Sequence, residues 1–156
     1  MNSKTVKRIL CIDYGDRNTG LAISDAMGWT AQPLDTIRRA DSASLKSTIE
    51  RICELVSYYD IGTVVIGYPK NMDNSEGTSC EKVKHFAGKL GEEFLENLPE
   101  HKVEIVFWDE RMSTMAAQRV LLEADMSRGK RKNVVDKTAA AYILQGYLEY
   151  ISKKEV

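Results

Sequence analysis

Residues 6–24 read VKRILCIDYGDRNTGLAIS, and this stretch decides the fold. Val6–Tyr14 is an apolar run with strand character, Gly15–Gly20 is rich in turn-forming residues, and Leu21–Ser24 begins a second strand. Because the connection is short, we expect the two strands to form a hairpin. The first strand then ends at Asp13, which places a carboxylate at its tip.

The next segment continues the sheet and then leaves it. Trp29–Ile37 predicts a third strand, and Pro33 favours an irregular or edge position for it, because proline has no N–H to donate. Apolar residues at helical spacing predict a helix over Asp41–Tyr59, for which Asp41 and Ser42 offer an N-cap.

Strands and helices alternate from there on. Thr63–Gly67 is a short apolar run typical of a buried parallel strand. The remaining predicted elements are a helix over Gly77–Leu98 that buries Leu90, Phe94 and Leu95, a strand over Val103–Trp108, and helices over Ser113–Ala124 and Val135–Ser152. This order predicts one α/β domain over residues 1–156. Its five-stranded mixed sheet has an antiparallel meander followed by parallel strands, with helices on both faces.

Composition narrows the class of protein. The 156 residues are 43% hydrophobic and 29% charged, which is typical of one compact soluble domain. No apolar stretch approaches the roughly 20 residues of a membrane span, so we expect a cytoplasmic protein without a membrane partner. The net charge of −1 gives no overall field for a polyanion.

Acidic residues stand at the ends of three predicted apolar runs. They are Asp13, the pair Asp109 and Glu110, and Asp136. If the strand that ends at Asp13 and the strand that ends at Asp109 are neighbours, and Asp136 opens a helix packed on them, these carboxylates converge. Their mutual repulsion then requires a divalent cation to offset it. The alternative is that each acid is only a polar strand end or a helix cap.

Four motifs carry a family resemblance over nearly the entire chain. In order, they are residues 13–25 (DYGDRNTGLAISD), 67–73 (GYPKNMD), 109–114 (DERMST) and 135–140 (VDKTAA). The chain resembles the YqgF family, also called RuvX, whose members are Holliday-junction-resolvase-like nucleases implicated in maturing the 5′ end of 16S rRNA. Tyr68 and Asn74–Gly77 depart from the usual pattern, but neither departure replaces an acid.

The resemblance implies an RNase H-like nuclease domain with Mg²⁺ or Mn²⁺, as two ions, held by Asp13, by the acidic pair Asp109 and Glu110, and by Asp136. Two such ions about 4 Å apart activate a water and stabilise the leaving oxygen of a phosphodiester. Strand alternation sends Asp109 and Glu110 to opposite faces, so only one of them binds metal. We favour Glu110, whose longer side chain reaches further, and keep Asp109 as the rival.

Basic and amide side chains near these motifs are candidate substrate contacts. They are Arg17, Lys70, Asn71 and Arg111, together with Lys130, Arg131 and Lys132 in the basic run before Lys137. Phosphate contact suits these residue types, and the expected partner is precursor rRNA or structured DNA. The alternatives are that the basic run is a solvated loop and that Arg111 pairs with an acid.

Other functions remain open at this point. A Holliday-junction-type DNA resolvase would use the same acids, and a nucleic-acid-binding module without catalysis would keep only the fold. A phosphate loop of the actin-like ATPases also begins Asp-x-Gly, although those proteins close two such domains around ATP. A homodimer is a further open possibility.

Overall fold

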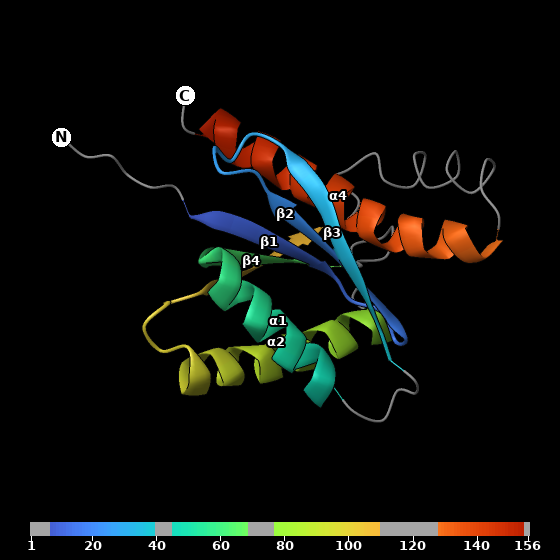
Figure 1. Cartoon of the computed structure of the whole chain (residues 1–156), viewed down its shortest axis with the longest axis horizontal. Helices are drawn as coiled ribbons and strands as arrows, with labels where there is room; N and C mark the ends of the chain where they lie inside the picture. The colour runs from blue at the N-terminus through green and yellow to red at the C-terminus, as the bar shows by residue number, and fades with distance from the viewer. Residues whose placement is uncertain (1–6, 40–44, 69–76, 110–127, 155–156) are drawn as a thin grey trace.

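The computed structural model describes residues 7–39, 45–68, 77–109 and 128–154, without the side chains of residues 78 and 128–136. The elements are β1 (Arg8–Asp13), β2 (Asn18–Ser24), β3 (Ala31–Arg38), α1 (Lys46–Tyr59), β4 (Ile61–Tyr68), α2 (Thr78–Asn97), β5 (Glu104–Asp109) and α4 (Arg128–Lys154). Figure 1 shows the strands between α4 on one side and the pair α1 and α2 on the other.

The strands form one mixed sheet in the order β3-β2-β1-β4-β5. Strand β1 pairs antiparallel with β2 and parallel with β4, and β4 pairs parallel with β5. The predicted meander followed by parallel strands is therefore confirmed. Pro33 lies on the edge strand β3, next to a register shift between Leu21 and Ala22, which agrees with its missing N–H.

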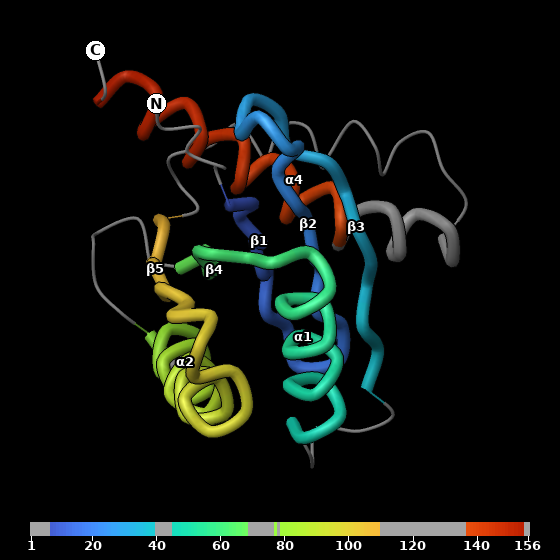
Figure 2. Tube along the Cα trace, turned by 60° about the vertical axis from the view of Figure 1, so that its left-hand side comes forward, coloured from blue at the N-terminus to red at the C-terminus, as the bar shows by residue number. Residues whose placement is uncertain are grey.

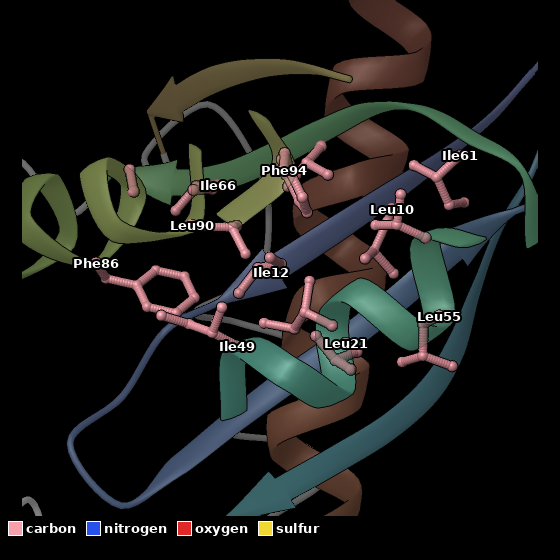
Figure 3. Packing of buried hydrophobic residues seen from close by; sticks show 14 of the residues in the cluster. Leu10, Ile12, Leu21, Ile49, Leu55, Ile61, Ile66, Phe86, Leu90 and Phe94 are labelled. Atoms are coloured by element: carbon pink, nitrogen blue, oxygen red, sulfur yellow. The ribbon is translucent and has the colours of Figure 1, made fainter. Parts of the chain in front are cut away.

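Alternation along β1 divides the core into two layers. Leu10 and Ile12 face α1 and α2, where they meet Ile66 of β4 and Phe86 of α2 in a continuous apolar cluster (Figure 3). Ile9 and Cys11 face the other side and pack against α4. All four β1 residues are buried, so the central strand is covered on both faces.

Helix α4 covers its face of the sheet with apolar residues. Ala139, Ala140, Ile143 and Leu144 are buried there. Gln145 of α4 ties the helix to the sheet edge, since its Oε1 accepts from the Ala31 N–H at 3.0 Å. Among the described helices, none combines the length and the apolar character that crossing a membrane requires.

Three predicted helix features differ from the structure. Helix α1 begins at Lys46 with Leu45 as N-cap and without a side-chain cap, so Asp41 and Ser42, which lie outside the described residues, do not start it. Leu95 is 77% exposed instead of buried. Helix α4 starts at Arg128, seven residues before the predicted Val135. The helix predicted over 113–124 lies outside the described residues.

Gly15 in the turn after β1 is required by a close approach. A Cβ at this position would lie 2.4 Å from the Asn18 carbonyl oxygen, closer than any real contact. Among the described glycines, positive φ occurs at Gly28 and not in this turn. Position 15 therefore requires glycine because there is no room for a Cβ, and not because the backbone there is left-handed.

Two glycine substitutions test this account in opposite directions. We expect Gly15→Ala to lower the free energy of unfolding by more than about 1 kcal/mol, because backbone must move. Gly88 is an exposed residue of α2, and an added Cβ there meets nothing within 4 Å. Gly88→Ala should therefore raise the free energy of unfolding by roughly 0.5–1 kcal/mol through helix propensity. Urea unfolding of both variants measures the difference, and equal effects would contradict it.

Candidate active site at the carboxyl ends of the strands

Asp13 and Asp109 end two parallel strands at the same edge of the sheet. Ile12 pairs with Ile66 of β4, and Tyr68 of β4 pairs with Asp109, so the two acids are nearly level. Strand β4 lies between their strands, however, and the expectation that these strands are neighbours is wrong. The backbones of β1 and β5 are about 10 Å apart, which is two strand spacings, because β4 lies between them.

The two acids fall on opposite faces by strand alternation. Asp13 continues the row of Ile9 and Cys11, which α4 covers. Asp109 continues the row of Ile105 and Phe107, and Phe107 meets the Tyr68 ring on the α1 and α2 side at a centroid distance of 5.1 Å. The sheet therefore does not bring Asp13 and Asp109 together through regular strand geometry.

A polar cavity of about 220 Å³ borders Asp13. Its other walls come from Gly15 and Asp16 in the turn after β1, Gly67 at the end of β4, and Ser79 and Lys82 of α2. Several waters fit in this volume, at about 30 Å³ each. The cavity lies on the α2 side of the sheet, whereas strand alternation directs the Asp13 side chain to the α4 side, so the two meet at the tip of β1. A carboxylate at a strand tip with room for water nearby suits Mg²⁺, which prefers oxygen ligands and retains part of its hydration shell.

The remaining predicted metal ligands lack described side chains. Asp136 is the ninth residue of α4, so it lies inside the helix and does not open it. Glu110 lies outside the described residues. Within the described part of the chain, no three His, Cys, Asp or Glu side chains group closely enough to hold a metal.

Only some of the predicted substrate contacts lie in the described part of the chain. Arg17 is exposed in the turn after β1. Lys130, Arg131 and Lys132 lie in the first turns of α4 and not in a loop, as its start at Arg128 shows. Lys70, Asn71 and Arg111 lie outside the described residues.

Arg39 holds the turn that follows Asp13, and the sequence reasoning missed it. Its Nη2 donates to the Tyr14 hydroxyl and the Gly15 carbonyl, both at 3.2 Å, and to the Asp16 carbonyl. Its backbone N–H also donates to the Arg17 carbonyl at 2.8 Å. The residue is 9% exposed. A buried arginine among main-chain acceptors fixes the turn, yet no local pattern distinguishes it from the exposed Arg38.

Lys82 is the second residue that the sequence reasoning missed. Its Nζ lies 3.2 Å from Asp16 Oδ1 and links α2 to the turn. The ion pair is about half exposed on both sides, so it contributes little stability by itself. Its position beside the cavity is the informative feature.

Comparisons with known proteins find relatives over most of the chain. A family model described as "RuvX: Holliday junction resolvase" matches residues 7–150. A protein of Staphylococcus aureus (strain JH9), named "Putative pre-16S rRNA nuclease", is 52% identical over 142 residues, which cover 91% of this chain and 95% of that one.

The fold is similar to that of RuvC. The structure of Thermus thermophilus RuvC in complex with a Holliday junction substrate has a TM-score of 0.60 at 13% identity, covering 96% of this chain and 97% of that one. A second T. thermophilus RuvC structure has a TM-score of 0.53 at 14% identity, with coverage of 94% and 96%. These likenesses confirm the expected RNase H-like sheet order.

The contacts of Arg39 generate a prediction about the turn. Arg39→Ala should lower the free energy of unfolding by about 2–3 kcal/mol, because it leaves part-buried carbonyls without their charged donor. Arg51→Ala is the control, since Arg51 makes exposed ion pairs with Asp35 and Glu54 at 3.9 and 3.5 Å and its loss should cost less than about 1 kcal/mol. Chemical denaturation measures both, and a cost for Arg39→Ala as small as the control's would refute the role.

Proposed function

Because the chain belongs to the RuvX family, we propose that it is a metal-dependent nuclease that hydrolyses phosphodiester bonds during 5′-end maturation of precursor 16S rRNA. The observation that carries this proposal is the 52% identity, over nearly the full length of both chains, to a relative named for that activity. The site supports it, since Asp13 ends the central strand at a tip that a polar cavity with room for water also borders.

The proposed metal ligands are Asp13, Glu110 and Asp136. Bound Mg²⁺ or Mn²⁺, as two ions, would supply an activated water and charge stabilisation for the leaving oxygen. The residues' own part is to hold carboxylate oxygens at fixed positions. Asp13 can do so because it pairs with Gly20 of β2, and Ile12 before it is held between β2 and β4 by its pairing with Ile66.

Strand geometry favours Glu110 over Asp109 as the ligand. Asp13 and Trp108 belong to the face that α4 covers, whereas Asp109 alternates to the opposite face. Continued alternation would return position 110 to the face of Asp13. Position 136 lies one helical turn before Ala139 and Ala140, which are buried against that same face.

We propose that the substrate contacts are Arg17, Lys70, Asn71 and Arg111 near the acids. The basic run at the start of α4 lies on a helix, so its positions are spread around the helix axis. At 100° per residue, positions 130, 131 and 132 spread over about 200° around the helix axis, so the three do not share one side. Lys130, Arg131 and Lys132 are therefore proposed as separate phosphate contacts and not as one patch.

A four-way DNA junction is the second candidate substrate. The family description names Holliday junction resolvase, and the chain has the fold of RuvC. The same acids would serve both substrates, because phosphodiester hydrolysis does not depend on the sugar. Parallel cleavage assays on the two substrates decide between them.

Removing Asp13 is the direct test of the proposed activity. Asp13→Asn should lower Mn²⁺-dependent cleavage of a labelled pre-16S rRNA 5′ segment by at least about a hundredfold, because the metals lose a ligand on the central strand. The control is Asp60→Asn at the opposite end of the sheet, where Asp60 is the left-handed C-cap of α1 and Asn is tolerated. Wild-type cleavage in excess EDTA, or an active Asp13→Asn, would overturn the proposal.

A second pair of variants separates the adjacent acids. Glu110→Gln should abolish cleavage at unchanged stability, because it removes a ligand, whereas Asp109→Asn should keep cleavage within about tenfold of wild type. Cleavage rates and thermal unfolding are measured for both. The reverse pattern would transfer the ligand role to Asp109 and show that the strand does not stay regular at its end.

A further inference from the structure

Helices α1 and α2 lie side by side on one face of the sheet (Figure 2), and a groove of about 850 Å³ runs between them. We call it the α1–α2 groove. Its walls are one side of α2 from Lys82 to Glu96, the first turn of α1 from Leu45 to Glu50, and the turn after β1 with Arg39. A groove of this volume is large enough for a small part of an extended polymer.

Charge is divided along the α1–α2 groove. Basic groups occupy the end next to the turn: Arg17, Lys46, Lys82, His85 and Lys89, with Arg39 beneath them. Asp16 is the one acid at that end among the described lining residues, and it is paired with Lys82. Carboxylates occupy the other end: Glu50, Glu92, Glu93 and Glu96.

Helical spacing makes the basic end a continuous track. Lys82, His85 and Lys89 are related by steps of three and four residues, so they share one side of α2. The track from Lys82 to Lys89 rises about 10 Å along the helix axis. Lys46 lies across the groove from it, at the start of α1.

The carboxylates at the acidic end lie near a half-buried thiol on α1. The pKa of Cys53 on α1 is raised to about 11, first by burial and then by the charges of Glu93 and Glu50. Glu93 on α2 and Glu50 on α1 thus act together across the groove. Negative charge at that end repels a polyanion.

The basic end is continuous with the cavity beside Asp13. Tyr14, Asp16 and Lys82 line both spaces. Tyr14 is fixed there by its ring stacked on Phe86 at 4.4 Å. A strand bound at Asp13 can therefore pass over the tip of β1, along the turn that lines both spaces, and continue along α2.

We propose that the basic end of the α1–α2 groove binds the backbone phosphates of a single-stranded segment of the substrate, a few nucleotides long and adjacent to the scissile bond. Lys82, His85 and Lys89 are the contacts from α2, and Lys46 is the contact from α1. The carboxylates at the far end stop the segment after those few nucleotides. This inference rests on the proposed nuclease function and names where its substrate's flanking strand binds.

The pair Lys82 and Asp16 does not prevent this binding. An ammonium has three N–H donors, and the pair is about half exposed, so the Lys82 Nζ can contact a phosphate at modest cost. Asp16 would then hold Lys82 in place at the junction of the two spaces.

The test is a binding measurement in EDTA, so that cleavage does not contribute. Fluorescence anisotropy follows a short labelled oligouridylate across a salt series for the wild type and for the double variant Lys82→Gln/Lys89→Gln. The control is Lys7→Gln/Lys153→Gln, which also removes one ion-paired and one exposed lysine. Lys7 pairs with Asp60 at 3.8 Å with a side-chain exposure of 47%, against 51% for Lys82, and lies at the opposite end of β1 from Asp13.

The double variant should weaken binding about tenfold or more at low salt and reduce the slope of log K against log salt by about 1.4, at 0.7 for each lost phosphate contact. The control should change neither quantity by as much. In a second arm, Glu92→Gln/Glu96→Gln should tighten binding of a longer oligouridylate more than that of the short one.

An unchanged salt slope in the lysine variant, or an equal loss in the control, would overturn the groove proposal. Equal tightening of both oligonucleotides in the glutamate variant would overturn the claim that the acidic end stops the strand. Loss of this binding site leaves the Asp13→Asn cleavage result intact, and an active Asp13→Asn enzyme leaves the metal-free binding result intact. The two proposals therefore fail separately.

Discussion

The burial of β1 on both faces is the constraint on which the rest of the structure depends. Leu10 and Ile12 belong to one apolar layer, and Ile9 and Cys11 belong to the other. A slip of one residue would exchange every side chain between the layers and turn Asp13 away from α4. The start of the strand is also fixed, since the Ile9 N–H donates to the buried Ser24 Oγ at 2.8 Å. The hydrophobic core thereby sets the direction of the carboxylate.

Local sequence patterns predicted the strands well because the burial of each strand is visible as an apolar run within its own residues. The apolar runs around β1 and β4 and the proline in β3 act within a few residues, so the sheet and its edge could be inferred from sequence. Helix starts were less accurate. Helix α1 begins after Leu45, without the side-chain cap that a search for Asp or Ser finds. The start of α4 is rich in Arg and Lys, which are good helix formers, but their charge also fitted the alternative of a solvated loop.

The candidate site was only partly accessible from sequence, because it depends on relations between distant segments. The acids could be selected by their positions after apolar runs, but the placement of β4 between β1 and β5 is a property of the whole sheet. Arg39 and Lys82 reach the turn after Asp13 from 23 and 66 residues away. Neither residue carries a local sign of that contact. The carboxylates of Glu110 and Asp136 remain predictions.

The link between Gln145 and Ala31 joins residues 114 positions apart. Helix α4 is synthesised after all five strands, and it supplies the apolar cover for Ile9, Cys11 and Val65. Until α4 has left the ribosome, the face of the sheet that carries Asp13 has no partner layer, and closing so long a loop makes this step slow. A protein of this design cannot complete the sheet face that carries Asp13 until nearly all of its chain has been translated.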